Sequence, residues 1–163
     1  MNMKIKQLAL YVIPLSLLLI TLLGCTSAEE TPDVESITLE RQPCFGFCPV
    51  YTVTLREDGT VEYDGQQNVE VTGPQTATID PGAVQTLGDE MIEAGYLDWE
   101  DAYTNQEVTD QAYAITTVTL ADGTTKRIDH YYGDFSAPEE LTELETRIDQ
   151  TANTAQWVGT PTP

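Results

Sequence analysis

Residues 41–51 organise the chain and read Arg-Gln-Pro-Cys-Phe-Gly-Phe-Cys-Pro-Val-Tyr. This stretch holds Cys44 and Cys48, two of the three cysteines in the chain, with three residues between them and a proline on either side. Pro49 favours extended backbone at Cys48, and Gly46 allows a tight turn between the two phenylalanines. The stretch therefore predicts a short loop that leads directly into a strand.

Alternation of polar and apolar residues predicts strands on both sides of this loop. Residues 36–40 have the period of a half-buried strand, and Tyr51, Val53 and Leu55 share one face of the next one. The turn signal Asp58-Gly59 then reverses the chain into a hairpin. Similar patterns predict a short strand at 76–79 and a second hairpin formed by 113–120 and 124–132.

Two segments carry the start signals and the period of helices. Asp80-Pro81 begins the first, because aspartate caps a helix and proline suits its first position, and Gly95 fits its end. Gly88 lies inside this helix, where it costs stability and so indicates close packing. The second helix follows Ser136-Ala137-Pro138-Glu139, which has the pattern of a capping box. Its apolar stripe comprises Leu141, Leu144 and Ile148.

The order of these elements is strands, helix, hairpin, helix. We predict an α+β fold with a single antiparallel sheet of about five to six strands and two helices packed on one face. Residues 96–111 are expected to form an irregular surface loop. Trp157 is expected to fold back over the edge of the core.

The N-terminal residues have the layout of an export signal. Lys4 and Lys6 precede an apolar run, and Leu22-Leu23-Gly24-Cys25 ends it. The last four residues resemble a bacterial lipobox, which implies that Cys25 is acylated and becomes the first residue of the mature chain. We therefore predict a lipoprotein signal peptide at 1–24, an acylated cysteine and flexible tether at 25–35, a single domain at 36–152, and a C-terminal tail at 153–163.

The charge is strongly acidic. The whole chain has a net charge of −20, and loss of residues 1–24 leaves five basic and 27 acidic residues, a net charge of −22. So negative a chain argues against nucleic acid and against electrostatic binding to anionic lipid. Attachment to a membrane is therefore expected through N-terminal acyl chains such as palmitate. The acid excess is consistent with solubility, and a docking face for a basic partner or for divalent cations is the alternative.

Cys44 and Cys48 are expected to form a disulfide, because an exported protein meets an oxidising environment. The alternative is a copper-binding or thiol-redox function, since Cys-x-x-x-Cys-Pro resembles the motif of copper-delivering Sco-type proteins. Two thiolates and the imidazole of His130, the single histidine, would suit copper. Against this, Cys48 runs into a strand without a strand-helix-strand pattern. A half-buried His130, bonded to its neighbours, is the expected structural role.

The run Ile-Thr-Leu-Glu-Arg-x-Pro-Cys-Phe-Gly-x-Cys-Pro-Val-Tyr-x-Val-Thr-Leu over residues 37–55 is followed by Asp58-Gly59-Thr60-Val61 and a tyrosine. This pattern resembles a bacterial domain of unknown function, the DUF6438 family. The resemblance extends over residues 36–152 and is most specific at the cysteine loop. It implies one domain in an exported, often lipid-anchored protein, and it implies no activity.

No catalytic signature is present: the sequence lacks Gly-x-Ser-x-Gly, a phosphate-binding loop and His-Glu-x-x-His. We therefore expect no enzyme activity, no cofactor and no resident metal. The expected function is that of a lipid-anchored module of the bacterial cell envelope, facing the periplasm or the exterior, which binds or scaffolds an envelope protein.

Overall fold

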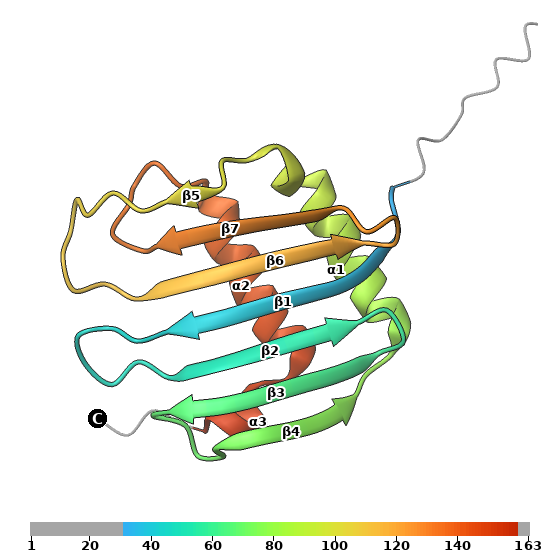
Figure 1. Cartoon of the computed structure of the whole chain (residues 1–163), viewed down its shortest axis with the longest axis horizontal. Helices are drawn as coiled ribbons and strands as arrows, with labels where there is room; N and C mark the ends of the chain where they lie inside the picture. The colour runs from blue at the N-terminus through green and yellow to red at the C-terminus, as the bar shows by residue number, and fades with distance from the viewer. Residues whose placement is uncertain (1–30, 160–163) are drawn as a thin grey trace, which may run out of the picture. The chain divides into compact units, whose positions relative to one another are not determined.

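The computed structural model describes residues 31–159, and a seven-stranded sheet runs through this part of the chain (Figure 1). The strands are β1 (Val34–Gln42), β2 (Val50–Arg56), β3 (Thr60–Gln67), β4 (Gly73–Thr78), β5 (Ala102–Tyr103), β6 (Tyr113–Leu120) and β7 (Thr125–Tyr131). Their order across the sheet is β4-β3-β2-β1-β6-β7-β5. The α+β class is confirmed. The expected leader at 1–24 and Cys25 lie outside the described residues.

The sheet is larger than predicted and is not purely antiparallel. β5 pairs in parallel with β7, through Ala102 opposite Asp129 and Tyr103 opposite His130. A strand of two residues is too short to show any alternation, so residues 96–111 looked irregular. The same segment also contains the 3-10 helix η1 (Tyr96–Asp98), in which Tyr96 is fully buried. The prediction of a surface loop over the whole of 96–111 was therefore wrong.

Two helices, α1 (Pro81–Glu93) and α2 (Glu139–Ala152), cover one face of the sheet and leave the other face open (Figure 1). α1 begins as predicted, because the Asp80 carboxylate accepts a hydrogen bond from the Gly82 amide. Gly88 faces Val34 at the start of β1, and a Cβ atom there would lie 2.5 Å from the Val34 Cγ2 atom. The close packing expected at Gly88 is confirmed.

The start of α2 differs from the predicted capping box. The residue before Glu139 is Pro138, and no side chain caps the helix. Ser136 instead donates from its amide and its hydroxyl to Asp134, so its hydroxyl is occupied in the preceding turn. Ser136 therefore belongs to the turn that Asp134 closes, and the helix begins only after Pro138.

The core lies between the sheet and the two helices. It contains the predicted strand faces of β1, β2 and β3 and the stripe of α2. Part of the expected tail joins this core, because α3 (Ala155–Val158) places Trp157 against Tyr63 with their ring centroids 4.8 Å apart. The Trp157 carbonyl also accepts a hydrogen bond from the Val71 amide. Trp157 therefore folds back as predicted, and ordered structure extends six residues beyond Ala152.

The two ends of the sheet carry different features. β1 begins at one end with Val34, and it finishes at the opposite end, where β2 and β6 begin and β7 finishes (Figure 1). Three loops meet this second end: residues 43–49, 104–112 and 132–138. Among the helices that the structure describes, none combines the length and apolar character needed to cross a membrane.

Candidate functional site

The loop between β1 and β2 is closed by the expected disulfide. The sulfur atoms of Cys44 and Cys48 are bonded, with the Cα atoms 5.7 Å apart. Inside the loop, the Gly46 amide donates to the Cys44 carbonyl, which makes a tight turn. Phe45 and Phe47 point outward and are 88% and 81% exposed. The disulfide therefore holds two large apolar side chains in solvent.

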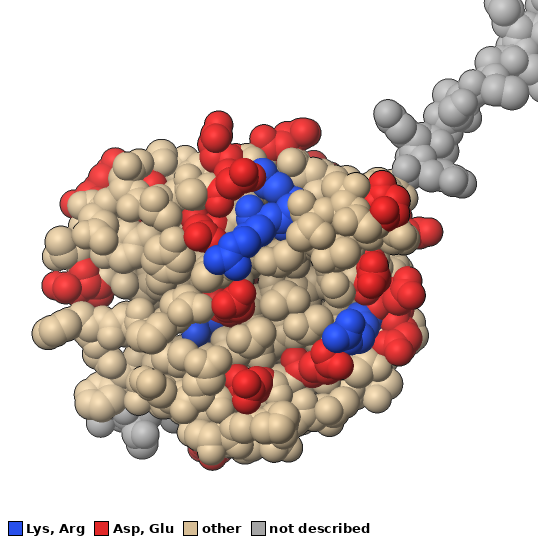
Figure 2. Space-filling model, viewed as in Figure 1, with Lys and Arg blue, Asp and Glu red and all other residues tan. Residues whose placement is uncertain are grey.

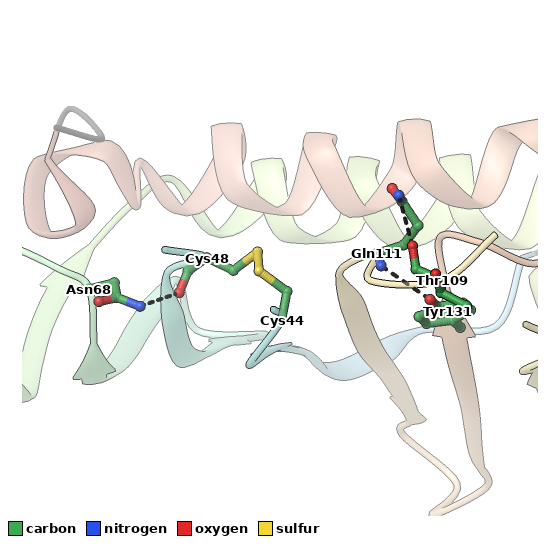
Figure 3. Close-up of a disulfide and its surroundings, with 6 residues drawn as sticks. All are labelled: Cys44, Cys48, Asn68, Thr109, Gln111 and Tyr131. Carbon is green, nitrogen blue, oxygen red and sulfur yellow. Dashed lines mark hydrogen bonds between the residues drawn. A yellow bond between two sulfur atoms is a disulfide. The ribbon is translucent and has the colours of Figure 1, made fainter. Parts of the chain in front are cut away.

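Asn68 fixes the far corner of this loop. It lies in the connection between β3 and β4, in the left-handed backbone region with φ 55°, and its side-chain amide donates to the Cys48 carbonyl at 2.9 Å (Figure 3). The disulfide loop is thus held by the bond between its own two cysteines and by a hydrogen bond from the connection between β3 and β4. Asparagine is the non-glycine residue best suited to this backbone region.

The loop at 104–112 is held by Tyr131 at the end of β7. The Tyr131 hydroxyl accepts from the Gln111 backbone amide (Figure 3). It also donates to the Val108 carbonyl. The amides of Glu107 and Val108 both donate to the Gly133 carbonyl. A Cβ atom on Gly133 would lie 2.2 Å from the Val108 carbonyl oxygen, so only glycine permits this approach.

The loop at 132–138 is organised by a buried carboxylate. Asp134 accepts hydrogen bonds from the Asn105 amide and from Ser136. The next residue, Phe135, is 71% exposed. The bonds from Asp134 thus tie this loop to the loop at 104–112 and turn a third phenylalanine outward.

The exposed large hydrophobic side chains of residues 31–159 all lie on these three loops. They are Phe45, Phe47, Val108 and Phe135. We call these four residues and their loops the apolar end of the domain. Scattered apolar residues on a surface need no explanation, whereas these four all lie on loops at one end of the sheet.

A network of buried polar side chains lies beneath the apolar end. Arg41, at the end of β1, bonds Asp149 of α2 through its Nη2 and Nε atoms, at 2.8 and 3.2 Å from one carboxylate oxygen. The other oxygen accepts hydrogen bonds from the hydroxyls of Tyr51 and Thr154. One carboxylate thus ties β1 and β2 to α2 and to the residue before α3.

The network continues inward through Glu145, which is fully buried on α2. Its Oε2 atom accepts from the Tyr132 hydroxyl, and its Oε1 atom lies 2.9 Å from the Nδ1 atom of His130. Arg41 donates to the same Tyr132 hydroxyl, which connects the two carboxylates. Each buried charge therefore has a hydrogen-bond partner, as burial of charge requires.

The pKa values of this network keep its donors protonated. Burial and then the charge of Glu145 raise the pKa of Tyr132 above its ordinary value, and burial and then the charge of Asp149 do the same for Tyr51. Burial alone would lower the pKa of Arg41, but Tyr132 and Asp149 outweigh it and raise that pKa. The guanidinium and both phenols therefore remain hydrogen-bond donors at neutral pH.

A pocket of about 240 Å³ opens between the disulfide loop and the start of β6. Three tyrosines, Tyr51, Tyr113 and Tyr132, contribute to its lining together with the disulfide loop and the outer part of the network. The remaining lining residues are Arg41, Gln42, Cys48, Pro49, Ala112 and Asp149. The pocket belongs to the apolar end, because its lining comes from the same loops and strand ends.

The structure does not bring together the residues of the copper alternative. Cys44 and Cys48 are bonded to each other, and the Nδ1 atom of His130 contacts Glu145 inside the core. Among residues 31–159 no group of three or more His, Cys, Asp or Glu side chains is arranged to hold a metal ion. His130 is buried and bonded to its neighbours, so the expected structural role is confirmed, with deeper burial than predicted.

Several residues of this end were not identified from the sequence. Glu145 and Asp149 could have been found from helical spacing. Glu145 follows Leu141 by four residues, and Asp149 follows Glu145 by four, so both fall on or beside the apolar stripe of α2. A charge on that stripe signals a buried partner. Asn68 and the pocket could not have been found, because each depends on contacts between segments far apart in the chain.

A search of curated proteins finds no match to this chain. A family model described as a domain of unknown function, DUF6438, matches residues 35–152. This range runs from the second residue of β1 to the end of α2 and so includes nearly the whole sheet, the disulfide loop and the polar network except Thr154. The match covers most of the chain and agrees with the resemblance seen at the cysteine loop. The chain belongs to the DUF6438 family.

Proposed function

We propose that this chain is a lipid-anchored protein of the bacterial cell envelope whose domain binds a protein partner through the apolar end. The observation that carries the proposal is the position of Phe45, Phe47, Val108 and Phe135 on three loops at one end of the sheet. Exposed phenylalanine has an unfavourable contact with water, and burial of such a side chain against a partner contributes about 1.5–3 kcal/mol.

The loops of the apolar end are fixed before any partner arrives. The disulfide, the Asn68 amide, the Tyr131 hydroxyl and the Asp134 carboxylate hold them in place. Ordering of flexible loops on binding costs affinity, so loops fixed in advance favour a binding function. If the disulfide served only to close a turn, its loop would not need two phenylalanines that point into solvent.

A protein partner fits this surface better than a membrane. The mature chain would carry a net charge of −22, which opposes contact with anionic lipid. The tether would join the domain at Val34, at the end of the sheet opposite to the apolar end (Figure 1). A domain attached at that end can present its apolar end to a partner without contact between the apolar end and the lipid to which Cys25 would be bound.

Lipid anchoring rests on the lipobox-like sequence before Cys25, and intact-mass analysis tests it. Protein extracted from the membrane of a producing bacterium should lack residues 1–24 and should carry added acyl mass on Cys25. An unmodified Cys25 in that protein would contradict the anchor. The result is independent of the docking surface.

Docking is tested with matched variants of the lipidated protein used as bait in solubilised envelope. A defined partner should be retained by the unchanged protein and by the variant T76S/T78S, which alters exposed residues of the edge strand β4. The variant F45S/F47S should lose it. Equal retention by all three proteins would overturn the assignment of the apolar end.

A further inference from the structure

We infer that the pocket beside the disulfide loop receives one aromatic side chain of the partner, from a segment with basic residues on either side of that side chain. The inference rests on the proposed docking function and names what the apolar end recognises. Four observations carry it: the size of the pocket, the bonds that already occupy its charged groups, its aromatic walls and the charge around it.

The size of the pocket suits a single side chain. Its volume of about 240 Å³ lies below the range of roughly 300–1,000 Å³ found for pockets that hold cofactors and drug-sized ligands. Protein interfaces, in contrast, commonly insert one large side chain into a small, desolvated pocket near their centre. The neighbouring Phe45 and Phe47 would then cover the area around that side chain and exclude water.

The charged groups of the pocket, Arg41 and Asp149, are already bonded within the protein, and so is the hydroxyl of Tyr132. The oxygens of Asp149 accept from Arg41, Tyr51 and Thr154. The Tyr132 hydroxyl donates to Glu145 and accepts from Arg41. A charged ligand would have to displace these bonds, whereas a neutral side chain needs no such exchange. The pocket therefore selects against a carboxylate and against an ammonium group.

The walls favour an aromatic ring over an aliphatic chain. Tyr51, Tyr113 and Tyr132 line the pocket, and aromatic pairs attract each other more strongly than the burial of their area alone explains. The Arg41 guanidinium lies 6.0 Å from the centre of the Tyr132 ring and adds a cation close to any ring bound there. A rigid ring also loses little side-chain entropy on binding.

The negative charge around the pocket favours basic residues on either side of the aromatic side chain in the ligand. The loop at 104–112 contributes Glu107 and Asp110, both exposed, while Arg41 is the single basic residue near the pocket and is paired with Asp149. On the open face of the sheet, Figure 2 also shows the few Lys and Arg side chains among Asp and Glu. Basic residues beside the aromatic side chain would meet these free acids.

Photo-crosslinking of the full-length, lipidated protein in detergent tests the inference. The probe is the peptide acetyl-Lys-(4-azidophenylalanine)-Lys-amide, and mass spectrometry maps the labelled residues. Labelling is expected at Pro49, Tyr113 or Tyr132. Excess acetyl-Lys-Trp-Lys-amide should compete, and acetyl-Lys-Ser-Lys-amide should not. The protein variant A112W provides a further test. Its tryptophan fills the pocket from a partly exposed position and should reduce labelling about tenfold.

The outcomes separate the pocket inference from the docking function. Labelling of Phe45, Phe47 or Phe135 without labelling of the pocket would overturn the pocket inference and leave the docking function standing. The absence of any label on the apolar end would overturn both. Equal competition by the serine peptide would show attraction by charge alone, and it would also overturn the assignment of an aromatic side chain.

Discussion

Arg41 joins the polar network to the pocket, and its removal should destabilise the fold. Its guanidinium pairs with Asp149 and lies 3.7 Å from the fully buried Glu145. The substitution Arg41→Ala would leave two carboxylates without their cation. Loss of one partner of a buried ion pair costs about 3–5 kcal/mol. We expect a loss near the lower bound, because Asp149 is partly exposed, and urea unfolding of the purified protein measures it.

Arg56 is the matched control on the neighbouring strand. It pairs with Glu62 at 2.6 Å, but both side chains are about half exposed. Exposed ion pairs contribute roughly 0.2–1 kcal/mol, so Arg56→Ala should change the free energy of unfolding by no more than that. Equal effects of the two substitutions would contradict the role assigned to Arg41.

The disulfide should contribute to stability and should also position the phenylalanines. Its loop is short, so the double variant Cys44→Ser/Cys48→Ser should lose roughly 2 kcal/mol of unfolding free energy in the chain-entropy account. The variant should fold, because neither cysteine belongs to the core. It should also lose partner binding, because Phe45 and Phe47 are no longer held. Full binding by the folded variant would show that the loop needs no bridge.

At the scale of an element, the packing of α1 on β1 depends on Gly88. A Cβ atom there would meet Val34 at 2.5 Å, and such overpacking costs about 1–3 kcal/mol. This cost exceeds the gain of up to ~1 kcal/mol that alanine brings to a helix. Gly88→Ala should therefore lower the thermal midpoint of unfolding.

Gly82 provides the control within the same helix. The nearest atom to a Cβ at Gly82 lies 3.5 Å away, which is ordinary contact. Gly82→Ala should leave the midpoint unchanged or raise it slightly, since it restricts the unfolded chain without strain. A rise for both variants would show that Val34 moves aside easily.

The sequence allowed most of the layered fold to be predicted, because alternation and capping are local signals. Tyr51, Val53 and Leu55 could be placed on the buried face, and Asp80 at the start of α1. β5 was missed because a parallel pair of two residues depends on β7, which lies about 25 residues further on. The start of α2 was misplaced because Ser136 lies in the turn that Asp134 closes and the helix begins after Pro138.

The candidate site was predictable only in part. The two cysteines and their loop were identified, and so was the buried histidine. The polar network was missed because Arg41 and Asp149 are separated by 108 residues and meet through the packing of α2 on the sheet. The apolar end required knowledge of the topology, which brings three separate loops to one end of the sheet.

At the scale of the whole molecule, the charge should make stability depend on salt. The five basic residues of the described part all pair with carboxylates, and the remaining acids repel one another. Added salt screens this repulsion, with a Debye length of about 10 Å at 0.1 M. The thermal midpoint should rise as NaCl increases from low ionic strength. A falling midpoint would show that the paired charges outweigh the repulsion.

The central claim is that the apolar end is the docking surface for a protein partner. The most direct measurement replaces Phe47 by the photoreactive residue p-benzoylphenylalanine in the producing bacterium, with the same replacement of Thr54 on the open face of the sheet as control. Ultraviolet light should yield a discrete protein adduct from position 47 and none from position 54. Equal adducts from both positions, an adduct to lipid alone, or no adduct at position 47 would contradict the account.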